Sequence, residues 1–296
     1  MASAKEGLTD LPKTIILTCE IKQPKNAIGR KSAPKNAALR GTARGIMENL
    51  RFEEACGRIV HQNVERAGIG TLSEKTIHAV LKYYYAPDVA HHEKKLAGFV
   101  ADAYTGEEIF EIQTRNFNTL RRKLDAFLPL CDVNIVYPVA HTKYLRYIDP
   151  QTGEVTAPRK SPKRGTPYAI FPELYRIKSY LTNEHLHIRI ALLDVEEYRF
   201  LDGWSENRRK GASKNDSLPL GLYGEFLLNG TSDYARLIPE NLPEQFTSKD
   251  YKKAARVSQP LANVALNILN HVGVAERVGK KGNLYVYERR APSVSK

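Results

Sequence analysis

The stretch from residue 96 to residue 115, LAGFVADAYTGEEIFEIQTR, constrains the fold of this chain more than any other. Two runs of alternating apolar and polar residues flank a Thr-Gly pair, which is the pattern of a β-hairpin. If Tyr104 pairs with Glu107 across a two-residue loop, Asp102 faces Ile109, and side chains two positions apart share a face. A four-residue loop keeps this parity, whereas a bulged three-residue loop breaks it.

The two faces of this hairpin differ in chemistry. One face is nearly all apolar, and the other holds two carboxylates and an amide at Asp102, Glu111 and Gln113. Neighbouring carboxylates repel each other, so a site that keeps them together usually also holds a cation. Carboxylate oxygens suit Mg²⁺ or Mn²⁺, and such an ion activates water and stabilises charge that develops on a phosphate oxygen. The alternative is a solvated hairpin face without a site.

The order of elements around the hairpin carries a family resemblance. A helix precedes it, a helix rich in Arg and Lys follows, and an apolar strand comes next. With Asp102 and the strand motif from Glu111 to Gln113, residues 70 to about 195 resemble the PD-(D/E)XK nuclease superfamily. The resemblance implies that Asp102 and Glu111 bind Mg²⁺ or Mn²⁺, that Gln113 is catalytic, and that Glu74 of the first helix joins them. Glu74 is equally explained by the preference of the helix dipole for an acid in the first turn.

Gln113 occupies the position where this superfamily most often has Lys, although some of its restriction enzymes carry Gln there. A neutral amide cannot supply the positive charge of a Lys, so another Lys has to reach the site, and Lys82, Lys94 and Lys143 are the candidates. The leading hypothesis is a metal-dependent hydrolase of DNA phosphodiester bonds. The alternative is a catalytically inactive, DNA-binding transcriptional regulator. The segments at residues 68–85 and 111–124 also resemble a group of uncharacterised bacterial proteins.

The charge balance favours a polyanionic partner. The 296 residues include 45 Lys and Arg against 33 Asp and Glu, a formal net charge of +12, which favours nucleic acid first and an anionic membrane surface second. No apolar run has the length of a membrane span, and no secretory h-region follows Met1. Three widely spaced cysteines form neither a disulfide framework nor a zinc motif. We therefore expect a cytoplasmic, DNA-binding protein without a membrane partner, and leave open whether it is a homodimer.

Hydrophobic periodicity divides the chain into three parts. Residues 1–45 form a basic flexible arm, and residues 46–218 form the nuclease-like domain with its N-terminal helix. Within that domain we expect helices at 46–64, 73–84 and 171–181, and buried strands at 132–138 and 187–195. The fold class is α/β, with a restriction-endonuclease-like mixed sheet flanked by helices.

Two polar loops interrupt the predicted domain. The first, at 149–167, is punctuated by Pro and Gly and contains four cations that are expected to be exposed and to contact DNA phosphates: Arg159, Lys160, Lys163 and Arg164. The second loop, at 202–217, contains the only tryptophan, Trp204, which either stacks on a base or anchors the loop. The alternative for the loop at 149–167 is a solvated loop that binds no ligand.

Residues 219–296 resemble a winged helix-turn-helix domain. Two helices are joined tightly, Ser258 caps the second, and a basic hairpin tip follows. The resemblance implies that the second helix enters the major groove and that the wing contacts the DNA backbone. The residues it assigns to DNA are Gln259, Asn263, Asn267, Lys280 and Lys281. Winged helices also act as protein-protein modules, which is the alternative.

Overall fold

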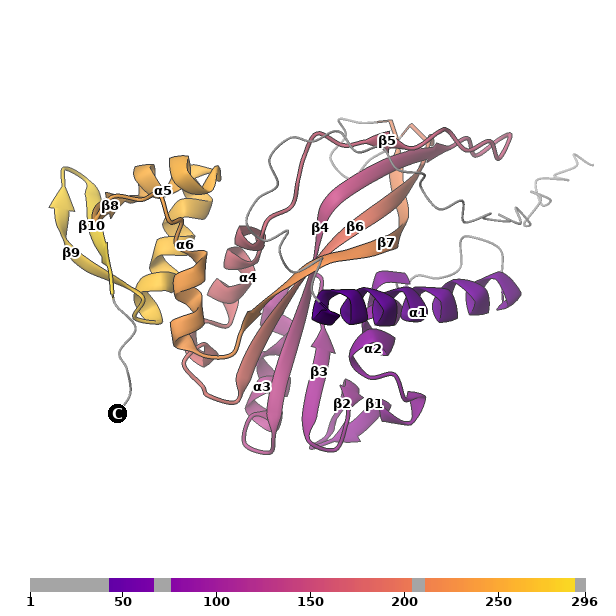
Figure 1. The fold of residues 1–296 in the computed structure, drawn as a ribbon, viewed down its shortest axis with the longest axis horizontal. Coiled ribbons are helices and arrows are strands. Elements are labelled where there is room, and N and C mark those ends of the chain that lie inside the picture. The colour runs from indigo at the N-terminus through magenta and orange to yellow at the C-terminus, as the bar shows by residue number, and fades with distance from the viewer. Residues whose placement is uncertain (1–42, 67–75, 204–210, 291–296) are drawn as a thin grey trace, which may run out of the picture.

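The structure is a computed structural model that describes residues 43–66, 76–203 and 211–290 (Figure 1). The basic arm up to residue 42, the predicted helix cap at Ser73, the candidate Glu74 and the single Trp204 lie outside the described residues. In the described part, no helix is long and apolar enough to cross a membrane.

A mixed sheet organises the molecule. Within the described residues it has seven strands in the order β1-β2-β3-β4-β6-β7, with β5 paired to β4. The pairs β3–β4 and β4–β6 are parallel, and the others are antiparallel. The strands are β1 (His92–Leu96), β2 (Phe99–Tyr104), β3 (Glu108–Ile112), β4 (Asp132–Ile148), β5 (Arg159–Lys160), β6 (Leu186–Phe200) and β7 (Ser213–Leu228). The α/β class with a large mixed sheet flanked by helices is confirmed.

Helices cover both faces of this sheet because its central strands are apolar on both sides. On β4, Val133 and Ile135 belong to the core on one face, whereas Val136 belongs to the core on the other. One face packs against the predicted first two helices, α1 (Ala43–Arg66) and α2 (Thr76–Tyr85). The other packs against α3 (Arg121–Phe127) and α4 (Phe171–Arg176) (Figure 1).

The register of the central hairpin differs from the expected one by two residues. Tyr104 pairs with Ile109, not with Glu107, so the loop has four residues instead of two. Thr105 closes this loop, because its backbone N–H donates to the carbonyl oxygen of Glu108 at 3.1 Å. The parity is unchanged, and the correct register brings Asp102 opposite Glu111.

The strands after the hairpin are longer than predicted. β4 and β6 pair in parallel along 15 residues of β6 and continue well past the apolar runs at 132–138 and 187–195. The expectation of a loop at 202–217 is wrong for residues 213–217, which begin β7 and pair with the end of β6. Ion pairs such as Arg146 to Glu196 occupy these extensions, so the strands lack the apolar alternation that would have revealed them.

The C-terminal unit contains the predicted two helices and hairpin. Its elements after β7 are η6 (Thr231–Leu237), β8 (Gln245–Thr247), α5 (Ser248–Ala255), α6 (Gln259–His271), β9 (Ala275–Lys281) and β10 (Leu284–Arg289). The predicted cap at Ser258 is confirmed, because its hydroxyl accepts from the backbone N–H of Leu261 at 3.4 Å. Strands β8, β10 and β9 form a small antiparallel sheet beside the two helices.

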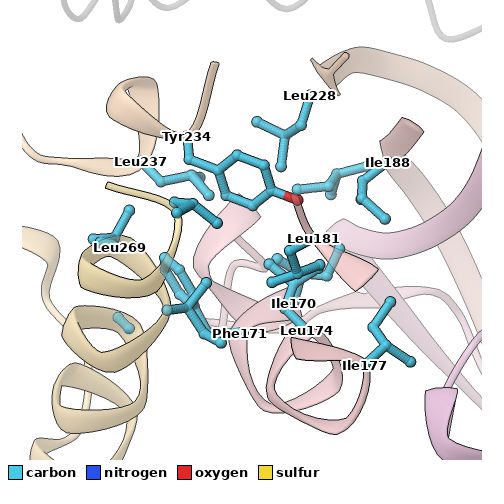
Figure 2. Packing of buried hydrophobic residues seen from close by; sticks show 14 of the residues in the cluster. Ile170, Phe171, Leu174, Ile177, Leu181, Ile188, Leu228, Tyr234, Leu237 and Leu269 are labelled. Carbon is cyan, nitrogen blue, oxygen red and sulfur yellow. The ribbon is translucent and has the colours of Figure 1, made fainter. Parts of the chain in front are cut away.

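One hydrophobic core joins this unit to the large sheet. Figure 2 shows Leu269 of α6 and Tyr234 of η6 packed with Phe171 of α4 and with Ile188 and Leu228 of the sheet. The predicted division at residues 218 and 219 falls inside β7, which pairs with β6 as far as Leu228. The C-terminal unit therefore begins after residue 228.

Candidate functional site

Strands β2 and β3 separate at the two acidic residues. Their described ladder ends at the pair Ala103 and Phe110, although both strands continue. Beyond that pair, carboxylates replace the missing backbone bonds: Asp102 accepts from the backbone N–H of Ile112 at 2.8 Å, and Glu111 accepts from the backbone N–H of Asp102 at 3.3 Å. The predicted convergence of Asp102 and Glu111 on one place is thus present, in the gap between the strands.

Lys123 of α3 is the main partner of Glu111. Its ammonium group donates to both carboxylate oxygens, at 2.7 and 3.0 Å. The Glu111 side chain is only 4% exposed. Burial and the negative charge of Asp102 raise the pKa of Glu111 to about 7, although Lys123 opposes this. Glu111 thus holds its proton far more tightly than an exposed glutamate does.

Asp102 is held from the face of the sheet that α2 covers, opposite to the face covered by α3. His78 of α2 lies with Nε2 3.1 Å from the Asp102 carboxylate, and both side chains are largely buried. Burial alone would raise the pKa of Asp102, but the bonds from His78 and Ile112 and the charge of Lys123 outweigh it, so this pKa lies below the ordinary 3.8. Asp102 therefore stays ionised beside a carboxyl group with a raised pKa.

The structure answers which lysine approaches the acidic pair. Lys82 is paired with Glu93, Lys143 donates to Glu197 at 2.6 Å, and Lys94 is exposed on the edge strand β1. None of these three candidates contacts the acidic pair within the described residues. Gln113, which occupies the motif position, donates its side-chain amide to the backbone carbonyl of Arg115 instead.

Two residues of the site, His78 and Lys123, were missed in the sequence. Lys123 lies three residues after Leu120 and four before Phe127, so it borders the buried face of α3, a signal that the Arg-Arg-Lys run obscured. His78 lies three residues before the buried Leu81 and is itself 8% exposed. Spacing places both at the edge of a buried helical face, but it does not say which strand each one meets.

The acidic pair fits a hard divalent ion by donor chemistry. Two carboxylates repel each other there, and Mg²⁺ binds proteins through one or two carboxylates while keeping waters and substrate phosphates as its other ligands. Among the described residues, no three His, Cys, Asp or Glu side chains are grouped so as to hold a metal alone. Asp102 and Glu111 would therefore hold such an ion only together with water or substrate.

The predicted phosphate-binding cations of the first loop are exposed, as expected. Arg159 and Lys160 form β5, which pairs with β4, and Lys163 and Arg164 follow it. We call residues 159–165 the basic strap. The strap is fixed by Gly165, whose N–H donates to the carbonyl of Ala140 at 3.1 Å.

The predicted base-reading residues of α6 are not equivalent. Asn263 is exposed, and Gln259 donates its amide to Ser248 at 2.8 Å and to Asn263 at 3.1 Å. Asn267 instead accepts from the Lys178 ammonium group at 2.8 Å, at the contact between the C-terminal unit and the rest of the chain. Lys280 and Lys281 lie exposed beside the β9–β10 turn, as predicted.

Comparison with known proteins identifies a family whose matched segment contains the large sheet. A family model described as "Domain of unknown function (DUF8091)" matches residues 75–229. The chain belongs to this family. A protein of Treponema pallidum (strain Nichols), named "Uncharacterized protein", is 28% identical over 225 residues, 76% of this chain and 88% of that protein. No solved structure matches the chain.

The DUF8091 match ends one residue after β7. It therefore contains the four residues of the candidate site, His78, Asp102, Glu111 and Lys123, and leaves out the C-terminal unit. The family segment and the structural unit end at the same place.

Proposed function

We propose that this protein is a metal-dependent nuclease that hydrolyses phosphodiester bonds in DNA. The observation that carries the proposal is the contact of Lys123 with Glu111 in the gap between β2 and β3, beside Asp102. A buried carboxylate pair with one cation suits the reaction, because phosphoryl chemistry needs positive charge where oxygen charge develops.

Each residue has a separate task. Asp102 and Glu111 would hold Mg²⁺ or Mn²⁺, and such an ion would supply a more acidic water and positive charge beside the phosphate. Lys123 supplies from α3 the positive charge that a Lys in place of Gln113 would supply from the strand. His78 and the backbone N–H of Ile112 fix the Asp102 carboxylate through its Oδ2 atom.

The arrangement of elements supports the resemblance to PD-(D/E)XK nucleases. The order is α2, the three antiparallel strands β1 to β3, then α3 and the parallel strand β4. That is the element order on which the resemblance rests. The helix pair α5 and α6 with its β9–β10 hairpin likewise supports a winged helix-turn-helix unit that binds DNA.

One observation favours the second candidate, a catalytically inactive DNA-binding regulator. Glu111 has Lys123 on both oxygens, and Asp102 has His78 and the Ile112 N–H on one oxygen. Such a network is satisfied without a metal. In a regulator these residues would only stabilise the sheet.

Cleavage of supercoiled, linear and single-stranded DNA with Mg²⁺ and with Mn²⁺ separates the two. We expect Glu111→Gln to abolish cleavage, and Lys123→Met to slow it by a factor of about 10² to 10³, the scale of losing one charge-stabilising donor. Gln113→Ala should keep most activity, because its amide bonds to Arg115. The matched control is Lys94→Met, an exposed lysine whose loss should change nothing.

The thermal midpoint of each variant shows whether it is folded. Undiminished cleavage by a folded Glu111→Gln or Lys123→Met protein would overturn the assignment of the site. Wild-type protein that binds DNA but leaves all three substrates intact with both metals would establish the regulator instead.

A further inference from the structure

A row of cations lies along one face of α5 and its C-terminal end. Lys249, Lys252, Lys253 and Arg256 are spaced by three, four and seven residues, which puts them on one side of a helix. All four are exposed and line an open hollow of about 540 Å³ that Gln259 closes on the side of α6. The row is about 10 Å long at 1.5 Å per residue.

In the described part of the chain, none of the four side chains forms an ion pair or a hydrogen bond. The one acidic residue of the helix, Asp250, faces away from the row, because its carboxylate accepts the backbone N–H of Thr247 at 2.8 Å and the Thr247 hydroxyl at 2.7 Å. The face is therefore uniformly positive.

Arg256 caps the C-terminal end of α5, where the backbone N–H of Val257 donates to the carbonyl oxygen of Lys252 at 3.1 Å. It ends α5 in the left-handed conformation, at φ 54° and ψ 44°, where Gly is the favoured residue. The conformation extends the basic row past the end of the helix and into the turn before α6.

The second helix is not available along its whole length. Leu266 and Leu269 are buried in the core shared with α4, and Asn267 is bonded to Lys178. Beside the basic row, α6 presents Gln259 and Asn263 from its first two turns. A groove that followed α6 lengthwise would have to displace Lys178 from Asn267.

We propose that the C-terminal unit binds the phosphate backbone of duplex DNA through the row Lys249, Lys252, Lys253 and Arg256, not through insertion of α6. This inference rests on the proposed DNA substrate and names the surface that holds it. Phosphates of one strand follow at about 3.4 Å along the duplex axis, so a row of about 10 Å can meet two or three of them. Contacts to phosphates carry no base information, so the binding is independent of sequence.

The test is fluorescence anisotropy of the full chain with labelled duplexes of two unrelated sequences, in EDTA so that no cleavage occurs. We expect the variant Lys252→Ala/Lys253→Ala/Arg256→Gly to bind both duplexes more weakly by about tenfold or more. The slope of log K against log salt should fall by about 2 to 3, about one unit for each lost phosphate contact. Arg256→Gly suits the left-handed backbone, so the variant should stay folded.

Two controls make the result specific. Lys94→Ala/Lys95→Ala removes a similar exposed pair of lysines from the edge strand β1 and should change affinity by less than about twofold. Asn263→Ala should leave affinity for both sequences unchanged, whereas a base-reading α6 would lose preference for one of them.

Equal binding by the triple variant and the wild type overturns this inference and leaves the nuclease proposal to its own cleavage assay. Equal losses in the α5 variant and the β1 control also overturn it, because the effect would then follow net charge alone. A wild type without affinity for either duplex refutes the α5 surface, while cleavage measured separately with Mn²⁺ still decides the nuclease proposal.

Discussion

At the scale of single residues, Glu111 is the least ordinary group of the described chain. It is a buried carboxyl beside a second carboxylate, with one ammonium group as its counter-ion. Negative charge in such a place is unfavourable, and burial together with the charge of Asp102 outweighs the bonds from Lys123. The folded protein therefore gains when Glu111 takes up a proton.

This gives a pH dependence of known sign. The folded carboxyl has a pKa of about 7 against an ordinary 4.5, so the folded state binds the proton more tightly than the unfolded state. Stability from this group is complete below about pH 4.5 and is lost as pH rises through about 7, by up to about 3 kcal/mol. The free energy of unfolding, measured with urea on metal-free protein, should therefore fall more steeply between pH 5 and pH 8 for the wild type than for Glu111→Gln.

The matched control is Glu107→Gln, which changes an exposed glutamate in the hairpin loop and should keep the wild-type slope. Parallel curves for the wild type and Glu111→Gln would refute the raised pKa. Asp102 does not confuse the comparison, since its lowered pKa acts at pH values below this window.

At the scale of elements, the basic strap with Arg159, Lys160, Lys163 and Arg164 depends on one glycine. A Cβ on Gly165 would lie 2.4 Å from the carbonyl oxygen of Ala140 and 2.6 Å from a methyl group of Val139. His141 also bonds to the Gly165 carbonyl, at 3.0 Å. The strap is thus fixed to β4 by backbone contact that no larger residue allows.

Gly165→Ala should destabilise the protein by about 1 to 3 kcal/mol, the usual cost of forcing extra atoms into a packed place. Chemical denaturation measures this. Gly57→Ala, at a helical position of α1 with no atom near the new methyl group, should be neutral or stabilising by up to about 1 kcal/mol. A Gly165→Ala protein as stable as the wild type would mean that the strap is not held where the structure has it.

The sequence predicted which residues of the hairpin share a face, but not the helix residues that contact them or the full length of the strands. Alternation on β2 and β3 fixed the parity of Asp102 and Glu111, and parity survived an error of two residues in the register. His78 and Lys123 were out of reach, because the rotation of a helix against a sheet depends on packing that no local pattern contains. The ends of β4 and β6 were missed since their ion pairs replace apolar alternation with polar residues such as Glu196 and Glu197. Strand β7 was not predicted at all.

At the scale of the whole molecule, the C-terminal unit and the sheet share one core. Leu269 of α6 is fully buried against residues of α4, and the same cluster continues to Ile188 in the centre of the sheet (Figure 2). Units that share a core of this kind are expected to unfold together. We therefore expect α6 and β6 to open in the same unfolding event.

Leu269→Ala should lower the free energy of unfolding by about 2 to 5 kcal/mol. Hydrogen exchange should become faster by a similar factor in the protected amides of both α6 and β6. Leu220→Ala, which truncates a leucine that is 53% exposed on β7, should change stability by less than about 0.5 kcal/mol. Faster exchange in α6 alone would show that the unit opens independently.

The shared core also links two distant surfaces without any change of shape. A ligand lowers, by one mass-action factor, the population of every open state that has lost its binding surface, and the shared core makes opening of the sheet such a state. Duplex DNA on the lysines of α5 would thus reduce how often β3 separates from its neighbours and admits water to Glu111. An anion bound to the helix pair at one end of the molecule would then favour the closed state around the carboxylates at the other end.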